Sequence, residues 1–353
     1  MQFEIEQRFN IVDKKIGEYT SFPTLLIHND NVLLACRTGI RNPKVAHGDG
    51  GKIRFFVSSL SDVTKWEEIK VSFNISNKKW HELDSILSIS KDNGVILITR
   101  RFSGTKGNTP FFSEISSNEI EQAIKNKFII ISREPLINKV TESSLASTLV
   151  FAACFGHIRS LDHKTLLMSC YANIGGDTLP SPVILVSSNC ENSWKLYSVI
   201  ENSDNFGAYL NEISILKIGK THWLTVIRTN TKPFPLYYSL SNNNCKTWSK
   251  LQATGLFGHA PMLEQDADGN IFLLYRDLET EIPHLSIAWR MTNNKWKRGL
   301  RVTDYNQVYD GGYGDLITIA PNLLLAVTYR DDEDSSPWIE GYVIRYKCNA
   351  KDE

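Results

Sequence analysis

Arginine recurs at one position of this chain, the end of the second strand in each predicted four-stranded unit. The arginines are Arg37, Arg100, Arg228, Arg276 and Arg330, and Tyr171 holds the position in the remaining unit. Strand propensity gives no reason for arginine there. Converging guanidinium groups repel one another unless an anion joins them, and their planar donors fit a carboxylate at two points. We expect an anionic ligand where these strand ends meet, although each arginine alone would also fit a surface residue or an aspartate partner.

A glutamate and a tyrosine are expected at the same pole. Glu212 enters an apolar inner strand, where a carboxylate is costly unless it is paired. Tyr313 stands among Gly311, Gly312 and Gly314, which permit unusual backbone angles and a close approach. A tyrosine deprotonated by glutamate is less repelled than a carboxylate by a reacting centre that bears its own acid group. The alternatives are a packed loop aromatic for Tyr313 and a plain salt bridge for Glu212.

The third chemical element is the loop His47-Gly48-Asp49-Gly50-Gly51 of the first unit. Its glycines would let it close over a substrate, with His47 as a binding residue. Asp49 is a candidate acid that protonates a leaving oxygen and later activates water. An ordinary Asp-Gly turn fits the same spacing.

The elements that position these residues show a decayed repeat, a serine followed seven residues later by tryptophan. The clear copies are Ser59 to Trp66, Ser187 to Trp194 and Ser241 to Trp248, and a fourth ends at Trp296 with Trp289 in place of the serine. Each copy would form the turn at the outer edge of a four-stranded sheet. A repeat of this kind predicts a propeller of β-sheets.

Strand signals divide residues 1–353 into six units, which predict an all-β, single-domain, six-bladed β-propeller. Their approximate limits are 18–80, 81–140, 141–205, 206–255, 256–305 and 306–347. The last unit lacks a fourth strand, and residues 1–12 alternate like a strand without a blade. We expect this N-terminal strand to pair with the last blade and close the ring, which removes exposed sheet edges. A short helix is expected over 117–124, inside the second blade.

Charge and composition restrict the classes of partner that the protein is expected to bind. Lys+Arg and Asp+Glu both number 39, so no overall field attracts nucleic acid or a membrane surface. No run approaches the roughly 18 apolar residues of a membrane span, and six scattered cysteines show no metal-ligand spacing. We expect a monomer without metal or cofactor. No leader is visible at the start, which favours the cytoplasm, with secretion of a processed form as the alternative.

Together these residues resemble the sialidase (neuraminidase) superfamily, over about residues 19–346. The serine-to-tryptophan spacings are similar to degenerate copies of its Asp-box, or BNR repeat. The resemblance implies a six-bladed propeller, three arginines that clamp a carboxylate, a tyrosine nucleophile with a glutamate partner, and an aspartate acid/base. By motif, Tyr313, Glu212, Arg228 and Asp49 take the places of the tyrosine, the glutamate, the second arginine and the aspartate.

The chain departs from that pattern at the arginines. The first arginine is replaced by Ser21, before Phe22 and Pro23, and the glutamate that steadies it is replaced by Arg330 or its neighbour Tyr329. Residues 282–284 lack the third arginine, for which we expect Arg276 to substitute. Arg330 or Arg37 is expected to supply the missing charge from another blade.

The function expected from this resemblance is removal of a terminal 2-keto sugar acid from an acidic glycan or glycoconjugate. Arg37, Arg100, Arg228, Arg276, Arg330 and His47 would bind the substrate. Two alternatives stay open at this point: a propeller that binds glycans without cleaving them, and a glycosidase or lyase for another acidic sugar that uses Asp49 and Glu212.

Overall fold

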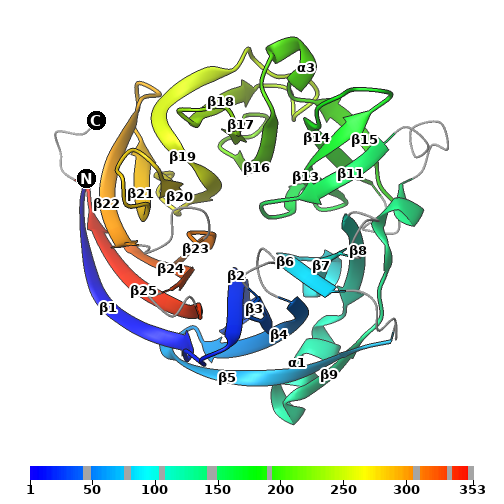
Figure 1. Cartoon of the computed structure of the whole chain (residues 1–353), viewed down its shortest axis with the longest axis vertical. Coiled ribbons are helices and arrows are strands. Elements are labelled where there is room, and N and C mark those ends of the chain that lie inside the picture. The colour runs from blue at the N-terminus through cyan, green and yellow to red at the C-terminus, as the bar shows by residue number, and fades with distance from the viewer. Residues whose placement is uncertain are drawn as a thin grey trace.

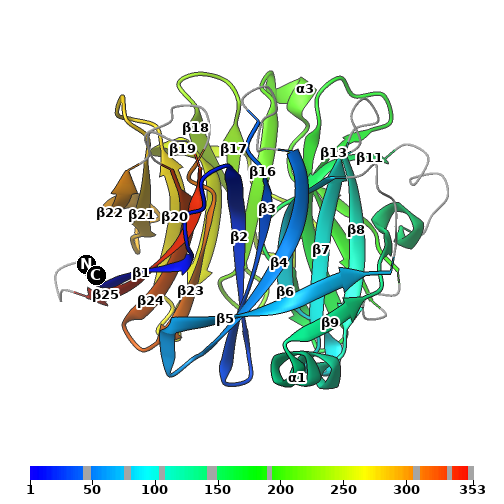
Figure 2. The ribbon, with the colours of Figure 1, turned by 60° about the horizontal axis from the view of Figure 1, so that its bottom comes forward.

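The strands form four-stranded units arranged around a central axis in the computed structural model of the chain (Figure 1). The structure describes residues 1–42, 49–74, 81–102, 108–140, 149–188, 193–304, 311–331 and 336–348. His47 therefore lies outside the described residues. Figure 2 shows the inner strands running along the axis of the ring.

The first two blades are sheets of consecutive antiparallel strands. The first contains β2 (Glu18–His28), β3 (Asn31–Ile40), β4 (Asp49–Ser59) and β5 (Asp62–Phe73), with β9 (Phe128–Ile131) added in parallel to β5. The second contains β6 (His81–Ile89), β7 (Val95–Phe102), β8 (Asn108–Ile115) and β10 (Glu134–Pro135). Two 3₁₀ helices, η1 (Lys91–Asn93) and η3 (Leu136–Lys139), accompany the second blade.

The next three blades include one strand that serves two of them. The third contains β11 (Leu149–Cys154), β13 (Thr165–Ile174), β14 (Ser181–Ser187) and β15 (Lys195–Val199), with β12 (Arg159–Asp162) beside β13. The fourth begins after α3 (Ser203–Phe206) with β16 (Leu210–Lys217), β17 (Trp223–Thr229) and β18 (Pro235–Ser241). The long strand β19 (Gln252–Gln265) completes it and opens the fifth, followed by β20 (Ile271–Asp277), β21 (His284–Arg290) and β22 (Trp296–Asp304).

The ring closes as the sequence predicts. The last blade contains β23 (Gly314–Ala320), β24 (Leu323–Arg330) and β25 (Trp338–Lys347), and β1 (Gln2–Val12) is its fourth strand. The antiparallel pairing of β1 with β25 runs from Gln2 opposite Lys347 to Val12 opposite Ile339. The six-bladed propeller and its closure by the N-terminal strand are thereby confirmed.

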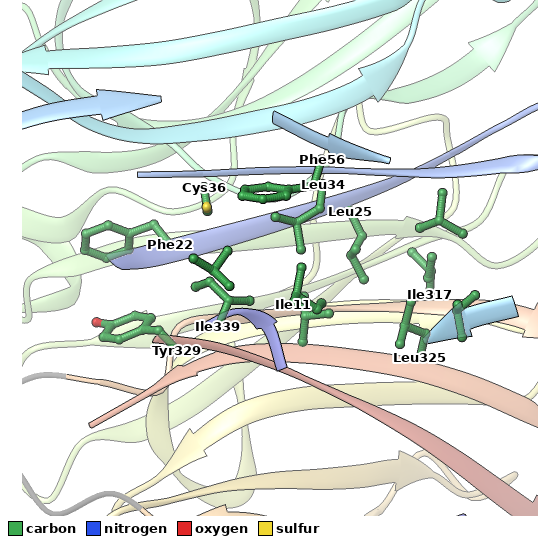
Figure 3. Packing of buried hydrophobic residues seen from close by; sticks show 14 of the residues in the cluster. Ile11, Phe22, Leu25, Leu34, Cys36, Phe56, Ile317, Leu325, Tyr329 and Ile339 are labelled. Carbon is green, nitrogen blue, oxygen red and sulfur yellow. The ribbon is translucent and has the colours of Figure 1, made fainter. Parts of the chain in front are cut away.

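Hydrophobic side chains from neighbouring blades interlock to hold the ring together. Figure 3 shows the cluster between the last and the first blade, where Leu25 and Leu34 face Ile317, Leu325 and their neighbours. Leu25, Leu34 and Leu325 are fully buried. Because each blade buries both faces, its inner strands read as continuous apolar runs instead of alternating patterns.

The expected helix is present as α1 (Ser117–Asn126). Ser116 caps it: the Glu119 amide donates to the Ser116 hydroxyl at 3.3 Å, and the Ser116 amide donates to Glu119 at 2.8 Å, a capping box. Its buried side chains, Ile120 and Ala123, pack in the core between the first and second blades. The helix therefore covers a junction between two blades, where we had expected it inside one.

Candidate active site

Strand register brings the predicted residues to one pole of the ring. In an antiparallel hairpin the start of the first strand lies opposite the end of the second. The pairs observed there are Ser21 with Arg37, Asp84 with Arg100, Asn211 with Arg228 and His259 with Arg276. Four of the five arginines therefore occupy the same place in their hairpins.

The central feature is a contact between Glu212, Arg228 and Tyr313. The Tyr313 hydroxyl donates to Glu212 Oε1 at 2.6 Å, and Arg228 Nη1 lies 2.6 Å from the same oxygen and 2.9 Å from the Tyr313 oxygen. Glu212 belongs to the fourth blade and Tyr313 to the last blade, 101 residues later in the chain. The sequence predicted all three residues, and the structure brings them together.

Electrostatics set the protonation of this group. Burial raises the pKa of Glu212, but the charge of Arg228 and the hydrogen bonds from Arg228 and Tyr313 outweigh it, so the net pKa lies below its usual value. Burial and then the Glu212 charge raise the pKa of Tyr313. The resting pair is therefore a carboxylate that accepts from a neutral phenol, and a proton can pass from Tyr313 to Glu212.

The second oxygen of Glu212 is held by the backbone. The Ala260 amide donates to Glu212 Oε2 at 3.0 Å from β19 of the fifth blade. Residues of three blades therefore fix the carboxylate, which orients Oε1 toward Tyr313.

Arg100 forms a separate ion pair at this pole. Its Nε donates to Asp84 Oδ1 at 2.9 Å, and its Nη2 donates to Asp84 Oδ2, so the fork of the guanidinium is matched at two points. Burial is the main cause that raises the pKa of Tyr171. The charges of Glu212 and Asp84 raise it further, against the opposing effect of Arg100. Arg100 therefore already has an internal carboxylate partner.

Arg37 is buried between two blades. Its Nε donates to the Glu82 carbonyl at 2.6 Å, and burial lowers its pKa to about 10. A Cβ on Gly51 would lie 2.3 Å from that Nε and 2.2 Å from the Glu82 carbonyl oxygen, so glycine is needed for the arginine to fit. Asp49, at the start of β4, accepts from Asn42 Nδ2 at 3.2 Å, and its charge acts on Arg37.

Arg330 has a different environment from its neighbour Tyr329. Tyr329 packs with Tyr313 and Phe22 in the core, whereas Arg330 lies 3.7 Å from Glu340 and over the ring of Trp338. Consecutive strand residues face opposite sides of a sheet. Among the described residues, the contacts of Arg330 do not include Glu212, Arg228 or Tyr313, so its expected role in the clamp stays a prediction.

Phe22 is a site residue that the sequence did not reveal. It follows Ser21, the residue at the missing arginine position, and has φ +54°. Its ring lies 5.1 Å from that of Tyr313 in an edge-to-face arrangement. Both rings line a cavity of about 40 Å³ together with Asp84 and Phe155. The wall beside Tyr313 is therefore aromatic, and the arginine that the family pattern would place next to Phe22 is absent.

Two further observations concern absent features. Within the described ranges, no group of three or more His, Cys, Asp or Glu side chains could hold a metal ion. No helix in the same ranges is long and apolar enough to cross a membrane.

Comparison with known proteins identifies the fold through structure alone. No family model matches the sequence, and no curated protein matches it. A solved protein of unknown function from Dyadobacter fermentans superposes with a TM-score of 0.76 at 15% identity, over 98% of this chain and 99% of that one.

Several of the similar structures are glycoside hydrolases. The GH93 α-L-arabinofuranosidase of Fusarium graminearum, solved with arabinobiose, has a TM-score of 0.68 at 12% identity over 97% of this chain and 98% of its own. The NanB sialidase of Streptococcus pneumoniae has a TM-score of 0.62 at 13% identity over 97% of this chain and 70% of its own. At these identities the similarity shows the propeller fold that such glycosidases share.

Proposed function

We propose that the protein is a glycoside hydrolase of the sialidase type, which removes a terminal acidic sugar, a 2-keto sugar acid, from a glycan. The observation that carries this proposal is the three-way contact in which Glu212 accepts from Tyr313 while Arg228 touches both. A tyrosine and a glutamate joined in this way suit attack on a centre that carries its own carboxylate. The fold shared with a sialidase agrees with this assignment.

The proposed reaction proceeds in two steps. The Tyr313 oxygen attacks the anomeric carbon while its proton moves to Glu212, and Asp49 gives a proton to the departing glycosidic oxygen. Water, deprotonated by Asp49, then displaces Tyr313, which recovers its proton from Glu212, so that configuration is retained. Both contacts of Arg228 with the pair use Nη1, and we assign Nη2 to the sugar carboxylate.

A second candidate is a hydrolase of a neutral sugar that uses Glu212 and Asp84 as its two carboxylates. The observation in its favour is that Arg100 and Arg330 both have carboxylate neighbours within the protein, Asp84 and Glu340. Internal pairing reduces the charge left to hold an acidic ligand. The similar GH93 arabinofuranosidase was solved with arabinobiose, a sugar without an acid group.

A panel of fluorogenic glycosides tests both candidates. The probes are the 4-methylumbelliferyl glycosides of N-acetylneuraminic acid, of a second 2-keto sugar acid and of α-L-arabinofuranose. The proteins are the wild type, Tyr313→Phe, Asp49→Ala and the control Tyr342→Phe. Tyr342 is a suitable control because it is also buried and also donates to a glutamate, Glu340, but from β25 in another contact group.

Each outcome assigns a function. Cleavage of an acidic glycoside that is lost in Tyr313→Phe and in Asp49→Ala but kept in Tyr342→Phe supports the proposal. Cleavage of the arabinofuranoside that survives Tyr313→Phe supports the second candidate. Binding of an acidic sugar by calorimetry without any cleavage would identify a glycan-binding propeller and refute both hydrolase assignments.

A further inference from the structure

A β-bulge interrupts β19 beside Glu212. The pairing of β19 with β20 runs through His259 opposite Arg276 and resumes at Met262 opposite Leu274, so β19 holds one extra residue. Ala260 within it has φ +52°, a region that residues with a side chain rarely adopt. Its amide is the one that donates to Glu212 Oε2. Bulges of this kind redirect side chains near functional sites.

The residue next to that bulge is His259, whose pairing with Arg276 places it at the same pole as the candidate pair. Its ring lies within range of the charges of Arg228, Glu212 and Arg276. The ring of Phe234 backs it at 4.9 Å in an edge-to-face arrangement, and Phe234 also has a positive φ, +67°. His259 therefore lies beside two residues with positive φ, Phe234 and Ala260.

The hydrogen bonding of the His259 imidazole is incomplete. Its Nε2 is buried and, among the described residues, has no hydrogen-bond partner. Such an atom normally binds protein or an ordered molecule, because leaving it unsatisfied is unfavourable.

The charge state of His259 restricts what that ligand group can be. Burial and then the positive charge of Arg228 lower its pKa, against the opposing effect of Glu212, and Arg276 lowers it further, to about 3. The imidazole is therefore neutral near pH 7, with one nitrogen that donates and one that accepts. A neutral imidazole has no charge to offer a carboxylate, and it holds no second proton to give to a leaving group. A hydroxyl, which both donates and accepts, is the complementary partner.

We propose that His259 determines specificity by hydrogen-bonding, through Nε2, a hydroxyl of the sugar held at Glu212, an inference that rests on the proposed function. The arginines would then recognise charge, and His259 would recognise the hydroxyl pattern. A site built around such a hydrogen bond discriminates strongly against an analogue that lacks the hydroxyl, because its polar group is then left unpaired.

The test compares each aryl glycoside that the wild type cleaves with its monodeoxy analogues. The variants are His259→Phe, His259→Gln, which keeps a polar group, and the control His222→Phe, an exposed histidine immediately before β17. For one deoxy position, we expect wild-type kcat/KM to fall about 100-fold relative to the parent glycoside. In His259→Phe, kcat/KM for the parent should fall about 10-fold to 100-fold and the preference should vanish. His259→Gln should restore part of it, and His222→Phe should match the wild type.

A nitrogen-15 NMR titration gives a second measurement that does not depend on turnover. The ring signal of His259, assigned by its absence in His259→Phe, should shift when the released sugar binds. Binding without such a shift, or discrimination unchanged in His259→Phe, would overturn this inference while the proposed function stands. Failure of the wild type to cleave any glycoside of the panel would instead overturn the proposed function, and this inference with it.

Discussion

Two carboxylates on inner strands, Asp315 and Glu212, show how the ring treats the same chemical group in two ways. Asp315 is fully buried on β23. It accepts from the Leu25 amide at 2.6 Å, the Leu316 amide at 2.8 Å, Thr24 Oγ1 at 3.2 Å and His157 Nε2 at 2.9 Å. His157 in turn lies 3.1 Å from the Leu87 carbonyl. Asp315 therefore ties the first, second and last blades to the segment that follows β11.

Glu212 differs from Asp315 in the kind of partner it has. Among the described residues, Glu212 accepts from one backbone amide, where Asp315 accepts from two, and its side-chain partners are Arg228 and Tyr313 in place of Thr24 and His157. The Tyr313 phenol can pass its proton to Glu212, whereas Asp315 has more backbone donors and its partner His157 is itself fixed by the Leu87 carbonyl. The contrast separates a carboxylate that stabilises the ring from one that is available for chemistry, and it can be tested at both sites.

Replacing Tyr313 by Phe should have the largest effect. We expect turnover of the cleaved glycoside to fall by at least about 10³-fold because the proposed nucleophile is lost. The free energy of unfolding should change by less than about 1 kcal/mol, since the Glu212–Arg228 pair is kept. Steady-state kinetics and urea unfolding check the two values, with Tyr342→Phe as the control. A large loss of stability with little loss of turnover would show that Tyr313, like Asp315, stabilises the ring and is not the nucleophile.

Replacing Asp315 by Asn should lower the free energy of unfolding more than it lowers turnover. It leaves His157 buried opposite a neutral group, and loss of one partner of a buried pair costs about 3 kcal/mol or more. Urea unfolding of the variant beside the wild type measures the loss. A variant as stable as the wild type would show that Asp315 does not hold the ring together.

Exchange of Arg228 for Lys should weaken acidic ligands. Lysine keeps the positive charge beside Glu212 but lacks the planar fork that matches a carboxylate. We expect affinity for N-acetylneuraminic acid to fall about 10-fold, measured by calorimetry. Arg330→Lys is the comparison, because Arg330 lies 3.7 Å from Glu340 and an unchanged affinity there would contradict its predicted role in the clamp. An equal loss in both variants would support Arg330 as a second member of the clamp.

The smallest effect should be a pH dependence of stability caused by His157. Burial and the charge of Arg159 lower its pKa, but the charge of Asp315 and the hydrogen bonds outweigh them and raise it above 6.5. The folded protein therefore binds this proton more tightly than the unfolded chain. Its stabilising contribution is complete below pH 6.5 and is lost as the pH rises through the folded pKa. We expect the free energy of unfolding in urea to fall as the pH rises above 6.5, and this decrease should be absent in His157→Gln.

Local spacing allowed much of the site to be predicted from the sequence. Glu212 and Arg228 stand on two strands of one hairpin, so their sixteen-residue separation already implies that they meet. The serine-to-tryptophan repeat and the unpaired strand of residues 1–12 likewise follow from local pattern, and they predicted the propeller and its closure. Tyr313 lies 101 residues from Glu212, and its place depended on the family resemblance.

Other parts of the site depend on details that no pattern contains. A strand has a period of two, so a shift of one residue decides whether Tyr329 or Arg330 faces Tyr313. The extra residue in β19 that presents Ala260 to Glu212 is invisible before the strands are paired. Neither composition nor spacing indicated that Phe22 would pack against Tyr313.

The amino-acid sequence by itself determined the repeated blades and the residue types available at one pole, because periodicity and hairpin spacing are local properties of the chain. Only the tertiary structure decided which charges neutralise each other and which remain beside Tyr313. That decision depends on register, on one bulge and on burial between blades. These are set by contacts between residues far apart in the chain.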